Sequence, residues 1–191
     1  GDVMNFDMGQ DFARMEGIKV ETVLINDEIS AFAVDQAEER RGTTADHLVI
    51  HVAGAAAESG MKFEPLKKLI EKAVFNCRSL GVSTSECTLP ETGLATFKLP
   101  EGRMEFGMGI HGEAGIEQVD LMTADATAER LCDDIIKDLP FKGGDEVLAV
   151  VEHHLHRPSG LLGQEVTDRD ANCVAFATKI TPDKRKIDLD A

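Results

Sequence analysis

The stretch Glu105-Phe106-Gly107-Met108-Gly109-Ile110-His111-Gly112-Glu113-Ala114-Gly115 organises this chain. Four glycines surround one histidine between Gly107 and Gly115. Glycine destabilises the interior of a strand or helix, so such a cluster indicates φ > 0 turns or close approach of the backbone to another group. Alternating apolar residues predict a strand over Glu105–Ile110. His111 would then follow the carboxyl end of a strand, where open α/β sheets bind ligands. The alternative is a glycine-rich turn with a structural histidine.

Composition restricts the classes of partner. The 191 residues suggest one domain, or one and a half, with 42% hydrophobic residues to form a core. The formal net charge of −15 disfavours nucleic acid and anionic membranes as partners. With nine Phe and no Trp or Tyr, aromatic stacking platforms for sugars or single strands are not expected. No apolar run is long enough to span a membrane.

Cysteine usage points to a reducing compartment. Cys77, Cys87, Cys132 and Cys173 form no CxxC pair, which argues against a zinc ribbon or a redox pair. We therefore expect a cytoplasmic protein. The chain begins with Gly1 inside what resembles a functional loop, which suggests a processed or partial chain.

Hydrophobic periodicity predicts an α/β fold, with layered helices on a mixed β-sheet. The first helix is expected to begin near Asn5 as a cap and to end before Gly17, with an apolar face of Phe6, Met8, Phe12 and Met15. A polar turn is expected at 26–28, and a helix capped by Thr43 or Thr44 should end at Gly60. The other predicted helices cover 65–80 and 123–139, and strands are predicted over 20–25, 82–89, 95–99, 146–151 and 172–180.

His111 and Asp2 are the two candidate reactive residues. A neutral imidazole can add to a carbonyl carbon and form a hemiaminal, which would select ketones and aldehydes over polyols. Asp2 precedes an apolar helix, so it can either cap that helix or direct a carboxylate into a cleft as a general acid or base.

Other polar groups have ordinary explanations as well. His47 and His51 have a spacing that suits a metal but lack the HExxH pattern, and nothing completes a ligand set around His153, His154 and His156. We therefore predict no metal site. Arg40-Arg41-Gly42 could bind an anion or a carboxylate, or form a solvated or subunit-contact loop. The sequence contains no GxxxxGK[ST], GxGxxG or GxSxG motif, so it shows no nucleotide-binding loop of its own.

Several motifs together resemble the substrate-binding subunit of the dihydroxyacetone (glycerone) kinases. Their order and approximate spacing match from Gly1 to about Val151, and a weaker similarity continues over 167–180. We accordingly divide the chain into a kinase-like α/β region at 1–151, with parts of two subdomains, and a shortened C-terminal segment at 152–191. The matching segments are Gly1-Asp2-Val3-Met4-Asn5-Phe6, Glu39-Arg40-Arg41-Gly42, Gly54-Ala55-Ala56-Ala57-Glu58, Cys87-Thr88-Leu89-Pro90 and Gly109-Ile110-His111-Gly112-Glu113-Ala114-Gly115.

The resemblance implies specific roles. The histidine matching His111 forms a covalent hemiaminal with dihydroxyacetone, and the aspartate matching Asp2 contacts the substrate hydroxyl and assists phosphoryl transfer. Gly1 and Gly109 are expected to line the same substrate site. Mg-ATP or Mg-ADP would be bound by a separate kinase subunit or domain, which in one bacterial version is recharged by a phosphocarrier. A homodimer and a role in glycerol metabolism are also implied.

Departures from the family pattern keep three hypotheses open. The family's N-terminal loop with a second histidine has no counterpart, Ala114 replaces a proline, and Glu39 replaces a glycine. The chain could be part of an enzyme, a non-catalytic dihydroxyacetone-binding sensor or co-activator, or a structural domain with an inert His111.

Overall fold

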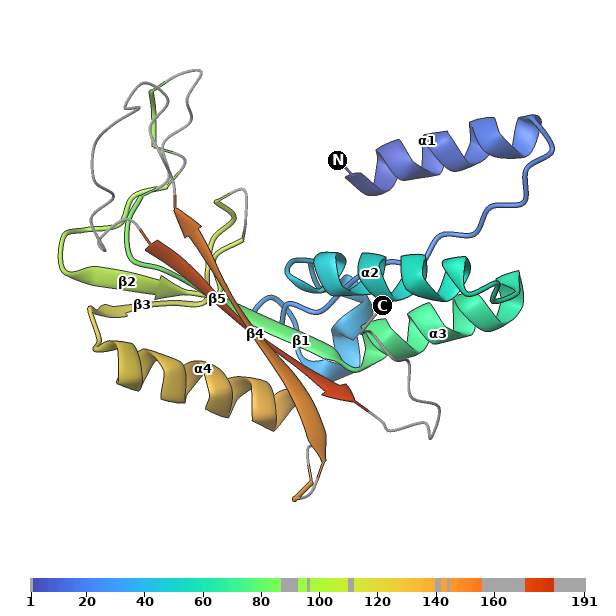
Figure 1. Cartoon of the computed structure of the whole chain (residues 1–191). Coiled ribbons are helices and arrows are strands. Elements are labelled where there is room, and N and C mark those ends of the chain that lie inside the picture. The colour runs from blue at the N-terminus through green and yellow to red at the C-terminus, as the bar shows by residue number, and fades with distance from the viewer. Residues whose placement is uncertain are drawn as a thin grey trace, which may run out of the picture.

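The structure is a computed structural model of the chain in which helices lie on both faces of an antiparallel sheet (Figure 1). It describes residues 2–86, 93–95, 97–109, 112–139, 142–143, 145–155 and 171–180. The helices are α1 (Asp2–Met15), α2 (Ala45–Glu58), α3 (Phe63–Phe75) and α4 (Ala124–Asp138), with a 3₁₀ helix η1 at Val34–Glu39. The strands are β1 (Cys77–Ser83), β2 (Arg103–Phe106), β3 (Glu117–Asp120), β4 (Glu146–Leu155) and β5 (Ala171–Ile180).

The sheet has the strand order β3-β2-β1-β5-β4, and each of these neighbours pairs antiparallel. The mixed sheet that we predicted is therefore wrong for the described strands, and the parallel bridge between Glu28 and Ser79 lies outside them. The predicted α/β class is confirmed. Strand β5 pairs with β1 along its length, from Cys77↔Thr178 to Ser83↔Asn172. The last described strand therefore lies inside the sheet, beside the central strand β1.

The two faces of β1 belong to two hydrophobic clusters. Leu80 and Val82 pack with Met104, Phe106, Leu131 and Ile135, so this face is covered by α4. Cys77 packs on the other face with Ala45, Val49 and Val74 of α2 and α3. Strand side chains alternate between faces, and the even and odd positions of β1 follow this rule. All seven residues of β1 are buried, as expected for the middle layer of three.

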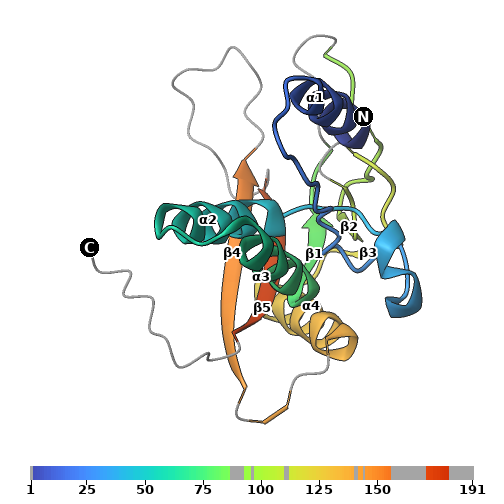
Figure 2. The ribbon, with the colours of Figure 1, turned by 90° about the vertical axis from the view of Figure 1, so that its right-hand side faces the viewer.

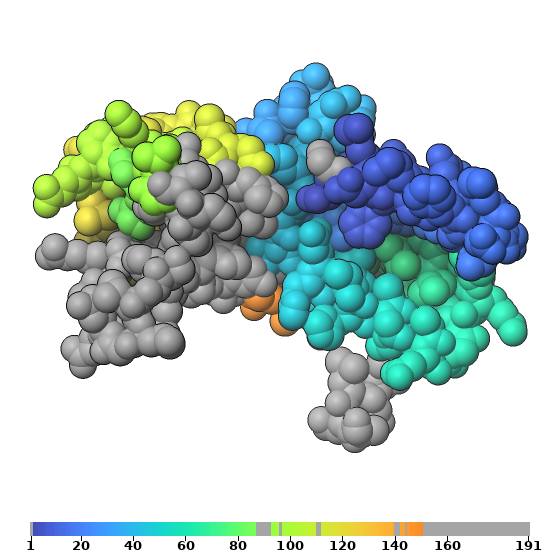
Figure 3. Space-filling view, turned by 90° about the horizontal axis from the view of Figure 1, so that it is seen from above, coloured from blue at the N-terminus to red at the C-terminus, as the bar shows by residue number. Residues whose placement is uncertain are grey.

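Helix α1 lies apart from the sheet in both ribbon views (Figures 1 and 2). The space-filling view shows it along the outer surface (Figure 3). The predicted apolar face exists as a pattern, but Phe6, Met8, Phe12 and Met15 are 55–81% exposed. The hydrogen bond from Gln10 to Thr22 (2.9 Å) helps to hold α1 against residues 20–23. The periodicity thus predicted the helix correctly, although no described residue buries that face.

The helix boundaries confirm some capping predictions and correct others. Helix α2 ends as predicted, because Gly60 at φ +81° allows the bonds Gly60 N–H to Ala57 O (2.9 Å) and Met61 N–H to Ala56 O (3.1 Å). Helix α4 begins after Thr123, whose hydroxyl accepts from Ala126 N–H. Asn5 is not a cap, because α1 already begins at Asp2.

Four predicted elements differ from the structure. Residues 20–25 form no strand, and Val23 and Ile25 instead pack against the α2–α3 cluster; their alternation reflects one-sided burial rather than strand pairing. The helix predicted over 65–80 ends at Phe75, where the Asn76 amide donates to Lys72 O (2.7 Å), and β1 follows at once. The described residues of 95–99 form no strand either, and of the strand predicted over 82–89 only Val82 and Ser83 belong to β1, since residues 84–86 form no strand. No described helix is long and apolar enough to cross a membrane.

Candidate functional site

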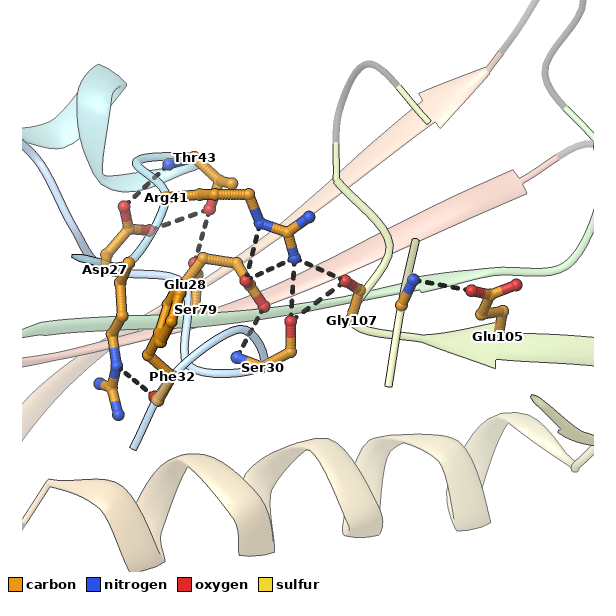
Figure 4. A network of polar contacts seen from close by, with 11 residues as sticks. Asp27, Glu28, Ser30, Phe32, Arg41, Thr43, Ser79, Glu105 and Gly107 are labelled. Carbon is orange, nitrogen blue, oxygen red and sulfur yellow. Dashed lines mark hydrogen bonds and ion pairs between the residues drawn. The ribbon is translucent and has the colours of Figure 1, made fainter. Parts of the chain in front are cut away.

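A buried polar network links the residue 26–30 segment, the Arg40–Gly42 loop and the end of β2 (Figure 4). Asp27 and Glu28 are 0% and 1% exposed, within the segment where the sequence predicted a polar turn. Buried carboxylates require partners, and both have them. Asp27 and Glu28 therefore lie in the interior and bind the neighbouring loops.

Asp27 joins α2 to the central strand. Its carboxylate accepts hydrogen bonds from the N–H groups of Thr43 (2.8 Å) and Ala45 (3.1 Å). It also accepts from the Thr43 hydroxyl (3.1 Å), which lies 2.6 Å from the Ser79 hydroxyl. Thr44 makes no side-chain cap bond. The start of α2 is thus capped by a carboxylate from another segment.

Glu28 pairs with Arg41 beside the end of β2. One carboxylate oxygen of Glu28 accepts from Arg41 Nη2 (2.8 Å) and Nε (3.2 Å), and the other accepts from Ser30 N–H (3.0 Å). Arg41 Nη2 also donates to the Gly107 carbonyl (2.8 Å), which accepts a second bond from the Ser30 hydroxyl (3.1 Å). Of the interpretations left open for the Arg-Arg-Gly loop, carboxylate binding is confirmed.

The described residues of the glycine-rich stretch, 107–109 and 112–115, are joined by hydrogen bonds after β2. Gly107 has φ +75°, so β2 ends at Phe106 rather than at Ile110 as predicted. Gly109 N–H donates to Glu113 O (3.0 Å), and Gly112, at φ +83°, donates to Gly109 O (3.0 Å). Gly115 N–H donates to the buried Glu105 carboxylate (2.7 Å). Both ends of the turn are therefore hydrogen-bonded to fixed parts of the sheet.

Close packing explains one further glycine of the turn, Gly115. A Cβ at Gly109 would overlap the Glu113 carboxylate and lie 2.8 Å from Arg41 Nη1, but both are ends of flexible side chains that can shift. A Cβ at Gly115 would overlap the Phe106 carbonyl and lie 2.8 Å from Glu105 Cγ. Because real Cβ atoms do not approach this closely, the predicted reasons for the glycine cluster, positive φ and close approach, are both confirmed.

Arg40 serves the fold on the other side of the loop. Its guanidinium donates to both oxygens of Asp138 (2.9 and 2.6 Å) and to Phe32 O (2.8 Å), and Arg78 donates to the same carboxylate. Burial alone would raise the pKa of Asp138, but hydrogen bonds and charges from Arg40 and Arg78 outweigh it and lower the pKa. This cluster fastens the end of α4 to β1.

Asp2 lies in the first turn of α1 and is exposed. It is a helical residue, so the capping interpretation of Asp2 is wrong, although its charge still suits the positive end of the helix. Burial, followed by the charges of Asp27 and Asp2, raises the pKa of Asp46 at the start of α2. The charge of Asp2 makes the smallest of these three contributions.

The remaining sequence candidates are only partly placed. His111 and Gly1 lie outside the described residues, so the structure does not show whether His111 and Asp2 meet. The rings of His47 and His51 lie on α2 with their centroids 4.4 Å apart and their planes tilted by 52°, and His51 Nδ1 is 2.8 Å from His47 O. His153 and His154 belong to the backbone of β4, and His156 lies outside the described residues.

Sequence reasoning missed Asp27 and Glu28. Two acids directly after an apolar run usually indicate a surface turn. The signal that could have identified them was the Arg40-Arg41 pair, which needs nearby carboxylates if its loop is buried.

Comparison with known proteins identifies the family. The family model described as the Dak1 domain matches residues 1–154. The chain is 41% identical over 169 residues to the dihydroxyacetone-binding subunit of PTS-dependent dihydroxyacetone kinase 2 of Listeria innocua, covering 88% of this chain and 48% of that protein. It is 40% identical over 140 residues to the L-erythrulose kinase of Pectobacterium atrosepticum, covering 73% of this chain and 24% of that protein.

Comparison with solved structures points to the same family. The crystal structure of the dihydroxyacetone kinase of C. freundii in its native form superposes with a TM-score of 0.78 at 26% identity, covering 95% of this chain and 37% of that one. The chain spans about half the length, or less, of the relatives that it matches. Because the family model matches residues 1–154 and a relative is 41% identical over 88% of the chain, the chain belongs to the Dak1 domain family of the dihydroxyacetone kinases.

Proposed function

We propose that this chain binds dihydroxyacetone through a covalent hemiaminal to His111 and presents it for phosphorylation to dihydroxyacetone phosphate. The observation that carries the proposal is the turn at 107–115, which has His111 at its centre in sequence and is fixed at both ends by hydrogen bonds. If hydrogen-bonded flanks restrict the turn, a nucleophile between them would meet a small ketone with little loss of entropy. The names of the related kinases, for dihydroxyacetone and for erythrulose, support a short ketose as the substrate.

The chemistry of binding balances without a cofactor. The unprotonated nitrogen of the neutral imidazole attacks the carbonyl carbon, and the C=O π bond breaks as the N–C bond forms. The carbonyl oxygen takes up a proton, and the other ring nitrogen releases its own. A polyol such as glycerol has no carbonyl carbon to attack and would not be held.

Phosphoryl transfer would require a second protein or domain. In our proposal a kinase subunit would hold Mg-ATP, or Mg-ADP that a phosphocarrier first rephosphorylates to Mg-ATP, and the substrate hydroxyl would attack the γ-phosphorus with release of Mg-ADP. Asp2 accepts the hydroxyl proton as the bond to the leaving nucleotide breaks. Its exposed position at the start of α1 is compatible with a site that faces a partner. We also propose that the protein works as a homodimer.

Intact-protein mass spectrometry under gentle ionisation tests the binding step. Addition of dihydroxyacetone should increase the mass by one triose, and glycerol should not. His111→Ala should abolish the adduct, whereas the matched control His51→Ala, on the exposed side of α2, should retain it. Adduct formation should fall as the pH drops below about 6.5, because a protonated imidazole is not a nucleophile. An unmodified protein without an adduct would refute the proposal.

A coupled assay with the nucleotide-bearing subunit of a dihydroxyacetone kinase tests the transfer step. Asp2→Asn should keep the adduct but lose most of the product, and Asp7→Asn on the same helix should change neither. An adduct with no product in the unmodified protein would identify a non-catalytic dihydroxyacetone-binding sensor instead.

A further inference from the structure

The guanidinium of Arg41 connects three segments that are far apart in sequence (Figure 4). Its Nη2 atom donates to the Glu28 carboxylate (2.8 Å), to the Ser30 hydroxyl (3.0 Å) and to the Gly107 carbonyl (2.8 Å). The Arg41 side chain is 24% exposed and that of Glu28 only 2%. Arg41 is thus a direct link between the Arg-Arg-Gly loop and the beginning of the glycine turn.

The Glu28 end of this link is fixed to the central strand. The Ser79 backbone accepts from Ile29 N–H (3.0 Å) and donates to Asp27 O (2.9 Å), which forms the parallel bridge to β1. Glu28 N–H also donates to the carbonyl of Arg41 itself (3.1 Å). Because Arg41 is held by both its main chain and its side chain, its guanidinium has little freedom to move.

The Gly107 end of the link determines where the turn begins. Gly107 N–H donates to Gly81 O in β1 (2.7 Å), and its carbonyl accepts the Arg41 and Ser30 bonds. Further along, Arg41 Nη1 occupies the space beside Gly109, where a Cβ would lie 2.8 Å away. The opposite end of the turn is held separately by Glu105 through Gly115. Arg41 therefore controls the approach of the turn to the sheet on one side.

We infer that Arg41 is a positioning residue for the ketose-binding turn at 107–115. This inference rests on the proposed function, because it assigns Arg41 the task of orienting the turn that forms the adduct. Arg41 need not touch the substrate. A charge-assisted hydrogen bond to a carbonyl at the start of a turn restricts its orientation more strongly than a neutral bond does. A displacement of about 1 Å in such a group can cost on the order of 100-fold in rate.

Adduct affinity in Arg41 variants tests the inference. Titration of dihydroxyacetone against Arg41→Ala should give a Kd about 10- to 100-fold weaker than that of the unmodified protein. Arg41→Lys should be intermediate, because lysine keeps the charge but not the planar fork of donors. The control is Arg103→Ala on β2, since Arg103 bonds Asp120 and Gln118 at the surface and should leave the Kd unchanged.

Chemical rescue and hydrogen exchange separate positioning from general destabilisation. Millimolar guanidinium should restore adduct formation in Arg41→Ala, because it can occupy the space between Glu28 and Gly107, and it should not affect the Arg103→Ala protein. Amide exchange over residues 107–115 should accelerate in Arg41→Ala, while the amides of α4 should keep their protection.

The outcomes distinguish the two proposals. An Arg41→Ala protein with unchanged affinity would overturn the inference and leave the proposed function standing. Loss of affinity that guanidinium does not restore, with faster exchange in α4 as well, would show a general structural role and would also overturn it. An unmodified protein that forms no adduct would overturn both.

Discussion

Substitution of Asp138 tests how the end of α4 is fastened to the sheet. Asp138 accepts both terminal nitrogens of Arg40 and a bond from Arg78. The side chains are 0% (Arg40), 8% (Arg78) and 11% (Asp138) exposed. Asp138→Asn keeps the shape but replaces one acceptor oxygen by a donor that faces the arginines. Two buried cations then lose their counterion.

The cost follows from burial. Removal of one partner from a buried ion pair destabilises a protein by about 3–5 kcal/mol, because it leaves an uncompensated buried charge. Both arginines retain backbone acceptors, Phe32 O for Arg40 and Phe75 O and Cys77 O for Arg78. Water can also reach the partly exposed carboxylate position. We therefore expect the free energy of unfolding to fall by an amount near the lower end of this range, about 3 kcal/mol.

Urea unfolding at pH 7 measures this loss. With a slope of about 2 kcal/mol per molar urea, a loss of 3 kcal/mol lowers the midpoint by about 1.5 M. The matched control is Asp120→Asn, which removes the partner of Arg103 where the carboxylate is 93% exposed. Its midpoint should not change measurably, since surface ion pairs contribute little.

The pH dependence gives an independent check. The folded-state pKa of Asp138 is lowered from its ordinary value of 3.8, so its stabilisation is fully present above that value. It is lost as the pH falls through the lower folded pKa. The difference in free energy of unfolding between the unmodified protein and Asp138→Asn should therefore disappear in strong acid. A gap below about 1 kcal/mol at pH 7, or one that does not change with pH, would refute the reasoning.

Three further predictions concern single residues. Gly107→Ala should destabilise the protein more than Gly17→Ala, because both glycines have φ near +75° but only at Gly107 would a Cβ lie 2.6 Å from Ser30 Oγ. The φ strain alone costs about 1–2 kcal/mol at either position. Equal losses of the free energy of unfolding, measured in urea, would contradict the close approach at Gly107. Asp46→Asn should raise the thermal midpoint at pH 7, because the folded-state pKa of Asp46 is raised and the protein therefore loses stability as the pH rises through that pKa. If Asp46→Asn still raised the midpoint below pH 3.8, the explanation would be contradicted. Ile135→Ala removes a side chain that is 2% exposed and should cost about 2–5 kcal/mol, measured by urea unfolding, whereas Ile136→Ala at 53% exposure should cost far less.

The sequence predicted the elements whose signals are local. Gly60 identified the end of α2, and the helix predicted over 123–139 matches α4, because capping and hydrophobic periodicity depend on neighbouring residues. The glycine cluster correctly predicted a turn with positive φ and close packing. The motifs from Gly1 to Val151 indicated the family that the comparison then established.

Only the tertiary structure decided which charges are internal. Asp27 and Glu28 look like a surface turn in sequence, yet they lie buried against Thr43 and Arg41, which are 13–16 residues further along. The strand expected at 20–25 failed for a related reason, since alternation reports burial on one side but not hydrogen-bonding partners.

Sequence alone therefore determined the α/β class, the family motifs and the candidacy of His111 and Asp2. The tertiary structure decided that Arg41 is bound by Glu28 and reaches Gly107 from 66 residues away. The physical reason is that capping and turn preferences act between neighbours along the chain. The cost of burying a charge, in contrast, depends on which distant segments the fold brings to it.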